Sequence, residues 1–228
     1  MLLTCPCFNA QNNDWSKTCD KDFLDLNIYT KFHESLICEK MVPTKADKIL
    51  REIEVLTKTR FLPIVGPQRG RILAGVVRDL KPKRVLEVGT RIGYSAILIG
   101  KNLGPDGHLI TIEIHADDAK IAEENINRAR IPPKVEVIVG DAKEVIPTLK
   151  GSFDLVFLDA AKDEYLVYLR LVEGKLHKGS VVVADNAGAF ADQMRGYLQY
   201  VRLSGKYESR YEPVGEDGLE ISIKKKDK

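Results

Sequence analysis

Two acidic positions of the chain each follow a short apolar run, so that their carboxylates could share one site. Asp159 follows the first run, and Asp185, with Asn186 directly after it, follows the second, 26 positions further on. Such runs favour buried parallel strands, and this spacing suffices for one helix and a return strand. Both carboxylates would emerge at the carboxyl edge of an open α/β sheet, where such sheets bind ligands. With Lys162 three residues beyond Asp159, the set resembles a hard-cation site beside a candidate base, which indicates an enzyme.

A glycine-containing turn between an expected strand and an expected helix indicates a second ligand site. Gly89 and Gly93 lie in the segment 85–95, where glycine lets a ligand approach the backbone. The free N–H groups at the start of the following helix can bind an anion. A dinucleotide-binding turn would read G-x-G-x-x-G, whereas this turn reads G-x-x-x-G and follows Glu87. A carboxylate at this place disfavours a pyrophosphate and favours a ligand that carries positive charge.

Two further carboxylates are expected at the same edge of the sheet. Glu113 ends the second expected strand, 24 residues after Gly89, where an acidic residue can accept both hydroxyls of a ribose. It therefore favours a nucleoside ligand without specifying which one. Asp141, directly before Ala142, also follows an expected strand. We interpret it both as a cofactor contact and as the N-cap of the next helix.

The elements that must position these residues alternate in the order typical of an α/β fold. Strands are expected at about 84–88, 109–114, 135–139, 153–158, 180–184, 207–212 and 218–224. Helices are expected at about 46–59, 72–79, 94–102, 116–129, 142–149, 163–173 and 191–203. The pattern predicts a mostly parallel seven-stranded sheet, closed by an antiparallel C-terminal hairpin, with helices on both faces.

Length and composition predict one domain with an N-terminal extension. The 228 residues are 44% hydrophobic and 30% charged, and the net charge of +2 gives no argument for a nucleic-acid or membrane surface. We place the extension at 1–60, with a poorly ordered polar start to about residue 20 and helices after it, and the catalytic domain at 61–228. No apolar stretch approaches the roughly 20 residues of a membrane span, and no signal peptide is apparent. A cytoplasmic protein is therefore expected.

Five motifs in a fixed order give the sequence a family resemblance. They are the segments 87–95, 111–113, 140–142, 158–165 and 185–186. Together they resemble the class I S-adenosylmethionine-dependent O-methyltransferases, specifically the catechol and caffeoyl-CoA O-methyltransferase group. The similarity covers about 60–224 and implies a Rossmann-like methyltransferase fold. Dimerisation through N-terminal helices is an expectation from family analogy alone.

The resemblance implies a role for each residue singled out. The methionine part of the cofactor S-adenosylmethionine would lie along Glu87, Gly89, Gly93 and Ser95, with Val65 near the sulfonium. Glu113 would contact the ribose, and Asp141 and Ala142 would contact the adenine. Asp159 would also contact the cofactor. Mg²⁺, or another divalent cation such as Mn²⁺ or Ca²⁺, would be held by Asp159, Asp185 and Asn186. Lys162 would be the general base. The acceptor would be a small molecule whose two neighbouring hydroxyls complete the metal shell.

The chemistry of methyl transfer agrees with these roles. Transfer from a sulfonium is an in-line displacement, which needs close positioning and a deprotonated oxygen. A phenol is mostly protonated at neutral pH. A divalent cation would stabilise its oxyanion, and Lys162 could take the proton. Two carboxylates and one amide oxygen leave roughly three of the six Mg²⁺ positions for water and substrate.

Departures from the group concern the acceptor, and other classes of function are disfavoured. Ala160 and Ala161 stand where catechol-type members carry bulky residues, and the segment 187–193 does not reproduce their longer substrate loops. A methyltransferase acting on RNA or protein is the main alternative, disfavoured by the lack of a basic face. A nicotinamide-dependent oxidoreductase is disfavoured by the missing G-x-G-x-x-G and by Glu87. Retention of Lys162 with all three candidate ligands disfavours a non-catalytic binding protein.

Overall fold

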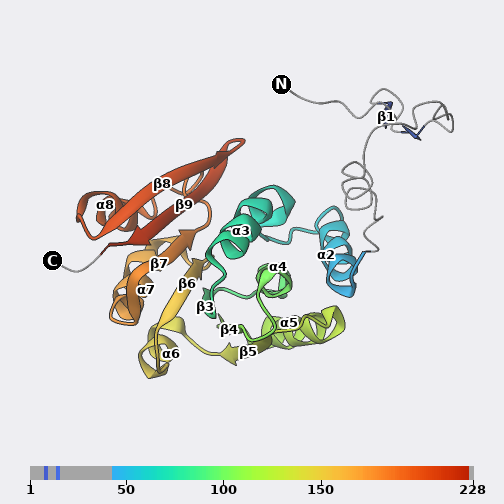
Figure 1. Cartoon of the computed structure of the whole chain (residues 1–228), viewed down its shortest axis with the longest axis horizontal. Helices are drawn as coiled ribbons and strands as arrows, with labels where there is room; N and C mark the ends of the chain where they lie inside the picture. Colours follow the sequence, from blue (N-terminus) through green and yellow to red (C-terminus); the bar gives the residue numbers. More distant parts are fainter. Residues whose placement is uncertain (1–7, 10–13, 16–42, 226–228) are drawn as a thin grey trace, which may run out of the picture. The chain divides into compact units, whose positions relative to one another are not determined.

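The computed structural model describes residues 8–9, 14–15 and 43–225 (Figure 1). The chain divides into two compact units, Met1–Val42 and Pro43–Lys228. In the first unit the described residues form two short antiparallel strands, β1 (Phe8–Asn9) and β2 (Asp14–Trp15). The rest of the expected polar start, and the helices expected before residue 40, lie outside the described residues.

A seven-stranded sheet forms the centre of the second unit. Its strand order is β5–β4–β3–β6–β7–β9–β8. The strands are β3 (Arg84–Val88), β4 (His108–Glu113), β5 (Lys134–Val139), β6 (Phe153–Leu158), β7 (Leu176–Ala184), β8 (Tyr207–Val214) and β9 (Asp217–Lys224). The pairs from β5 to β7 are parallel, whereas β9 runs antiparallel to both β7 and β8. The predicted sheet and its C-terminal hairpin are thereby confirmed.

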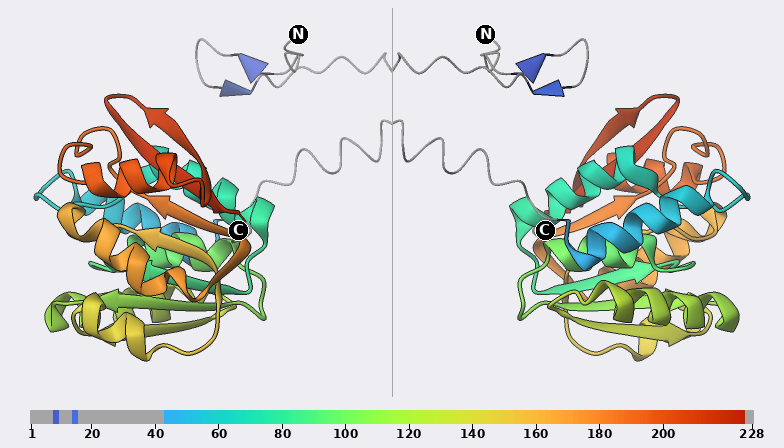
Figure 2. Two further views of the ribbon diagram at one scale, coloured as in Figure 1. Left: turned by 90° about the vertical axis from the view of Figure 1, so that its left-hand side faces the viewer. Right: turned by 90° about the vertical axis from the view of Figure 1, so that its right-hand side faces the viewer.

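Helices cover both faces of this sheet (Figure 1). One layer consists of α2 (Lys45–Leu56), α3 (Gly66–Leu80), α4 (Tyr94–Asn102) and α5 (Ala116–Ala129). The other consists of α6 (Ala142–Thr148), α7 (Tyr165–Glu173) and α8 (Arg195–Leu203). The side views bring each layer to the front in turn (Figure 2). No helix within the described residues is long and apolar enough to cross a membrane.

Alternate residues along each central strand divide between two hydrophobic cores. In β3, Val85 packs in the core with α3, α4 and α5, whereas Leu86 packs in the core with α6, α7 and α8. Both side chains are fully buried. This division follows from the period of two along a strand. Strands buried on both faces are apolar throughout, which explains why the sequence shows them as continuous runs.

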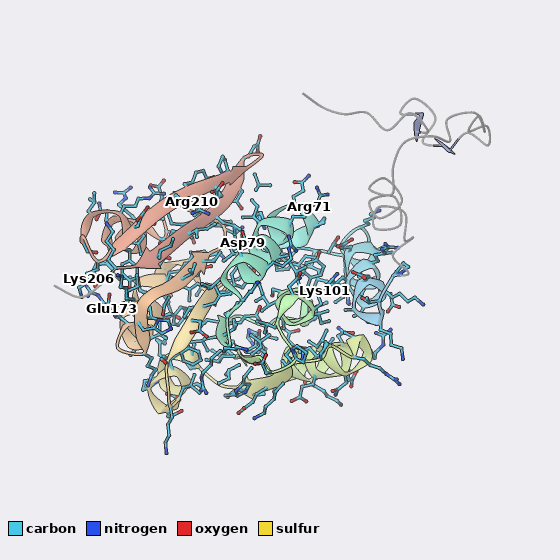
Figure 3. All side chains as sticks on the ribbon, in the orientation of Figure 1. Arg71, Asp79, Lys101, Glu173, Lys206 and Arg210 are labelled. Atoms are coloured by element: carbon cyan, nitrogen blue, oxygen red, sulfur yellow. The ribbon has the colours of Figure 1, made fainter. Side chains whose placement is uncertain are left out.

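The compact unit begins at Pro43, so that it includes α2, which packs on α4 and α5, although we placed residues up to 60 in the extension. Thr44 caps α2 in a capping box, in which its hydroxyl accepts from Asp47 N and the Asp47 carboxylate accepts from Thr44 N. Ile53 of α2 is buried in the core. Lys101 of α4, which Figure 3 labels, pairs with Asp47 and joins the two helices.

Three elements begin at positions other than those expected. Helix α3 begins at Gly66 rather than near residue 72, because Pro67 fits the first turn of a helix, where its missing N–H is not needed. Strand β7 begins at Leu176 and passes through Gly179, with a register irregularity against β6. Helix α8 begins at Arg195 rather than near residue 191, because residues 185–194 form successive turns.

A polar cluster joins α7, α8 and β8. Glu173 accepts hydrogen bonds from Tyr200 at 2.7 Å and from Tyr207 at 3.0 Å, and Lys206 pairs with it at 3.4 Å (Figure 3). The guanidinium of Arg170 lies over the Tyr200 ring, 3.7 Å from its centroid. Because these contacts connect α7, α8 and β8, we assign the cluster to the stability of the fold.

Candidate functional site

The carboxyl ends of β3, β4, β6 and β7 open into one cavity of about 660 Å³, a size typical of small-molecule sites. Strand β3 lies between β4 and β6, so the cavity is at the point where the strand order reverses. Most of the predicted site residues line it: Gly89, Ser95, Glu113, Asp141, Ala142, Asp159, Lys162, Asp185 and Asn186. Three predicted residues, Val65, Glu87 and Gly93, are not part of this lining.

Glu87 is a fully buried carboxylate in β3, beside residues that line the cavity. Its Oε2 accepts a hydrogen bond from Thr111 Oγ1 at 2.6 Å, and the Thr111 hydroxyl is also bonded to that of Thr90. Its Oε1 has no hydrogen-bond partner among the described residues. Burial raises the pKa of Glu87 to about 7, against the opposing effect of the Ser95 and Thr111 hydroxyls. A buried carboxylate with a free acceptor atom is suited to a cationic ligand.

Gly89 and Gly93 both adopt left-handed backbone conformations, with φ of 97° and 86°. A Cβ on Gly89 would clash with the carbonyl oxygen of Asp159, and one on Gly93 would lie 3.3 Å from Ala122. Both glycines are therefore required by backbone geometry and by the close packing of the protein itself. Close approach of a ligand, the reason expected from the sequence, is not needed to explain them.

Glu113 is fixed at the end of β4 by two backbone donors. Arg91 N donates to its Oε2 at 2.7 Å, and His115 N donates to its Oε1 at 3.0 Å. Hydrogen bonds to an ionised carboxylate are among the stronger ones in proteins. Each carboxylate oxygen can still accept a second hydrogen bond, so the side chain is held ready for hydroxyl donors in the cavity.

Asp141 is the N-cap of α6, as the sequence predicts. Its side chain accepts a hydrogen bond from Lys143 N at 2.8 Å. The Lys143 ammonium lies 3.5 Å from Asp141 Oδ2 and also pairs with Glu164. Because Asp141 and Ala142 both line the cavity, the capping role is compatible with a cofactor contact.

The ends of β6 and β7 bring together Asp159, Asp185 and Asn186. The hydrogen bonds between the strands continue to this point, since Asp159 N donates to Val88 O and Asp185 N donates to Leu158 O. Each of the two carboxylates has one close cation. Lys162 Nζ lies 2.9 Å from Asp159 Oδ1, and Arg69 Nε lies 2.8 Å from Asp185 Oδ1. Burial, together with the neighbouring Asp159 carboxylate, raises the pKa of Asp185.

Lys162 stands at the start of a 3₁₀ turn (Lys162–Glu164) before α7. Its Nζ donates hydrogen bonds to Asp159 Oδ1 and to the Tyr165 hydroxyl, both at 2.9 Å, and its side chain is only 13% exposed. Burial, reinforced by Asp159, raises the pKa of Tyr165 well above its usual value, so the phenol stays protonated. That phenol donates to the Asp185 carbonyl oxygen at 3.4 Å. Lys162 Nζ is therefore held in one place beside the carboxylate pair.

The family model described as O-methyltransferase matches residues 41–202. The chain belongs to the O-methyltransferase family. Catechol O-methyltransferase B of Danio rerio is 42% identical over 172 residues, which cover 70% of this chain and 64% of that protein. Catechol O-methyltransferase of Sus scrofa is 37% identical over 174 residues, which cover 71% of this chain and 92% of that protein.

A solved structure supports the same fold. The O-methyltransferase TomG from Streptomyces achromogenes, in complex with S-adenosylmethionine, superimposes with a TM-score of 0.66 at 28% identity. The alignment covers 86% of this chain and 95% of TomG. The predicted family and the predicted Rossmann-like fold are confirmed by these similarities. This chain spans 64% of the length of the Danio rerio relative, which is slightly less than two thirds.

The residues predicted to hold a metal in this chain fit a hard divalent cation. Carboxylate and amide oxygens are its preferred ligands. Although Arg69 Nε is close to Asp185 Oδ1, neither atom has a hydrogen-bond partner among the described residues, so this buried carboxylate oxygen keeps acceptor capacity. Within the same residues no group of three or more His, Cys, Asp and Glu side chains forms a metal site. The candidate set contains two such residues and takes its third ligand from an amide, that of Asn186.

Three residues at the candidate site are given no role by the sequence analysis: Arg69, Tyr165 and Asp217. Arg69 NH1 donates to Asp217 Oδ2 at 2.6 Å across 148 positions of the chain, and no local pattern could reveal that contact. Tyr165 lies three residues after Lys162, a spacing that places two side chains on one helix face. That spacing, and its place in the motif 158–165, are the signals that could have found it.

Part of the cavity lining is apolar, and we call it the apolar wall. Phe61 and Phe190 line the cavity and are 93% and 39% exposed. Ala160 and Ala161 also line it. Large exposed apolar side chains at the rim of a concave site favour contact with an apolar part of a ligand.

Proposed function

We propose that this O-methyltransferase moves a methyl group from S-adenosylmethionine to one hydroxyl of a small molecule with vicinal hydroxyls, in a reaction that needs a divalent cation. One observation carries the proposal: Lys162 lies beside the two carboxylates and the amide in the same cavity as the cofactor residues. Relatives named as catechol O-methyltransferases and the S-adenosylmethionine complex of TomG support it. No nucleic-acid partner is part of the proposal, and a homodimer stays a prediction.

The cofactor half of the site consists of carboxylates and glycine-bearing turns. Glu113 would accept hydrogen bonds from the ribose hydroxyls while its backbone donors hold it in place. Asp141 and Ala142 would border the adenine. Glu87 and Ser95 would lie along the methionine, where the free Glu87 Oε1 favours the ammonium group. These contacts fix the direction in which the methyl group is offered.

The acceptor half consists of the cation ligands and the base. Asp159, Asp185 and Asn186 would hold Mg²⁺, or alternatively Mn²⁺ or Ca²⁺. When bound there, the cation would stabilise the oxyanion of the acceptor. Lys162 Nζ would take the proton from the reacting hydroxyl, and its hydrogen bond to Tyr165 keeps it in position. The apolar wall with Phe61 and Phe190 would cover the acceptor ring and exclude water.

A metal-supplemented transfer assay tests the proposal. S-adenosylmethionine should bind with or without metal, as measured by calorimetry. Methylation should be found in a screen of catechols, caffeoyl thioesters and small hydroxylated metabolites, and only when Mg²⁺ or Mn²⁺ is present. Excess chelator should abolish transfer, and added Mg²⁺ should restore it. Full activity in chelator would refute the metal assignment, whereas failure to bind S-adenosylmethionine would refute the function.

Replacement of Glu113 tests the cofactor half separately. Glu113→Ala should weaken S-adenosylmethionine binding by roughly 1.5–3 kcal/mol, the contribution of a hydrogen bond to a charged group. At saturating cofactor, kcat should change little, because Glu113 touches no reacting atom in the proposed complex. Calorimetry and steady-state kinetics measure the two effects. Glu124→Ala, at an exposed position of α5, is the matched control. An unchanged cofactor affinity in Glu113→Ala would remove the ribose role.

A further inference from the structure

Asp217 is the first residue of β9, where the chain turns back from β8 (Figure 1). Its side chain is 14% exposed. The carboxylate contacts two segments that are distant in the sequence, the start of α3 and the turns after β7. The turns after β7 contain the proposed ligand Asn186, and Arg69 at the start of α3 pairs with the proposed ligand Asp185.

The two oxygens of Asp217 accept hydrogen bonds from different groups. Oδ1 accepts from two backbone donors, Gly188 N at 3.2 Å and Ala189 N at 2.9 Å. Oδ2 accepts from two side chains, Arg69 NH1 at 2.6 Å and Asn186 Nδ2 at 2.7 Å. The backbone donors fix Oδ1 in place, and Oδ2 is thereby directed at the two side chains.

The contact with Oδ2 determines the orientation of the Asn186 amide. An amide has two ends of nearly equal shape, and the hydrogen-bond partner decides which end points where. Because Asn186 Nδ2 donates to Asp217, its Oδ1 is the end left for a cation. The backbone of Asn186 is itself left-handed, with φ of 63°, which limits other placements of the side chain.

Asp217 also acts on a second cation ligand. It pairs with Arg69 through NH1, and the Nε of the same guanidinium lies 2.8 Å from Asp185 Oδ1. The guanidinium is hydrogen-bonded to Asp217 and forms an ion pair with Asp185. Asp217 is therefore linked to Asp185 through Arg69 and to Asn186 directly.

We propose that Asp217 is a positioning residue for the cation site, which selects the amide orientation in which Asn186 presents oxygen and holds Arg69 against Asp185. This inference rests on the proposed function, in which Asp185 and Asn186 hold the divalent cation. Partners that orient metal ligands typically contribute 10- to 100-fold to metal affinity.

The isosteric variant Asp217→Asn reverses the polarity of one end of the side chain. Its oxygen stays with the backbone donors of Gly188 and Ala189, so its nitrogen faces Asn186. Two amide nitrogens then oppose each other. Rotation of the Asn186 amide by half a turn restores a hydrogen bond, but it places Nδ2 where the cation needs an oxygen.

Binding of Mn²⁺, followed by electron paramagnetic resonance at saturating S-adenosylmethionine, measures the effect without any turnover. Asp217→Asn should weaken Mn²⁺ binding by about 10- to 100-fold. Its affinity for S-adenosylmethionine and its melting temperature should stay close to those of the unaltered protein. Glu216→Gln removes one charge from the same turn, at an exposed residue, and should leave Mn²⁺ binding unchanged.

The exchanged pair tests whether the hydrogen bond between positions 186 and 217 supports cation binding, and Glu216→Gln controls for the loss of one charge. In the double variant Asn186→Asp/Asp217→Asn, the amide nitrogen at 217 donates to the carboxylate at 186, whose other oxygen faces the cation. Mn²⁺ affinity should recover most of the loss, because the pair restores both the hydrogen bond and the net charge of the turn. Recovery would not be expected if Asp217 only stabilised the hairpin.

Each outcome decides a different question. Unchanged Mn²⁺ affinity in Asp217→Asn, or an exchanged pair no better than the single variant, would overturn the positioning role and leave the proposed function standing. Absence of Mn²⁺ binding in the unaltered protein would overturn the metal-dependent function and this inference with it. A loss of Mn²⁺ affinity that matches a loss of melting temperature would show a structural role only.

Discussion

Lys162→Ala should lower kcat by about 10²- to 10⁴-fold, the range typical of general acid–base catalysis. Lys162 Nζ is held by Asp159 and Tyr165 beside the proposed cation ligands, where it can take the proton of an acceptor hydroxyl. Once the amine is removed, water must accept that proton without the same positioning. Steady-state kinetics at saturating cofactor, acceptor and Mg²⁺ measure the loss.

Binding measurements separate a catalytic role of Lys162 from a structural one. The ammonium lies 2.9 Å from Asp159 Oδ1, so its removal takes away positive charge next to the cation site. Affinity for Mn²⁺ should then stay equal or increase while kcat falls. S-adenosylmethionine should bind as in the unaltered protein.

Two further variants complete this test. Lys162→Arg retains the charge but cannot act as a base at neutral pH, so it should be as inactive as Lys162→Ala. Lys120→Ala, at an exposed position of α5, should be fully active. If Lys162→Ala loses cofactor binding, the division of the cavity into a cofactor half and an acceptor half is wrong. If it keeps the full kcat, Lys162 is not the base.

The part of the site that the sequence predicts is the part attached to strand ends. Asp159 and Asp185 could be placed because each follows a run buried on both faces, and parallel strands end at one edge of the sheet. Glu113 could be placed for the same reason. The family resemblance then added roles that spacing alone does not specify.

The remaining part depends on contacts between segments far apart in the chain. Arg69 reaches Asp185 from the start of α3, and Asp217 reaches Asn186 from the C-terminal hairpin. No periodicity or motif carries such a contact, because it depends on how the α3 layer and the hairpin pack around the sheet. At the glycine turn, the neighbouring backbone of Asp159 requires a glycine at position 89, and the cofactor contact of Gly89 stays a prediction.

Glu87→Gln should make the cofactor-free protein more stable at pH 8 and weaken its binding of S-adenosylmethionine. The carboxyl is fully buried, and burial raises its pKa from 4.5 to about 7. A raised carboxyl pKa means that the folded state holds the proton more tightly than the unfolded state. The stability of the folded protein therefore falls as the pH rises from about 4.5 to about 7, by roughly 3 kcal/mol at 1.36 kcal/mol per pKa unit.

A glutamine at this position has no proton to lose. Its carbonyl oxygen can still accept from Thr111, so the packing is retained. Chemical denaturation should show the variant more stable than the unaltered protein by roughly 3 kcal/mol at pH 8, with a much smaller difference at pH 5. If the substitution changes the free energy of unfolding equally at both pH values, ionisation of Glu87 does not destabilise the folded protein.

The same ionisation favours the cofactor, because a buried carboxylate with a free oxygen can bind an ammonium group. Binding of S-adenosylmethionine to Glu87→Gln should weaken by roughly 1.5–3 kcal/mol, measured by calorimetry at pH 8.

In the unaltered protein the affinity for S-adenosylmethionine should rise with pH through about 7, as Glu87 ionises, and in the variant this rise should be absent. The substitution would then raise the folding stability of the cofactor-free protein and lower its affinity for S-adenosylmethionine. This is the behaviour expected of a binding site in which a buried charge destabilises the fold and binds the ligand. A variant that binds as tightly as the unaltered protein would place the ammonium elsewhere.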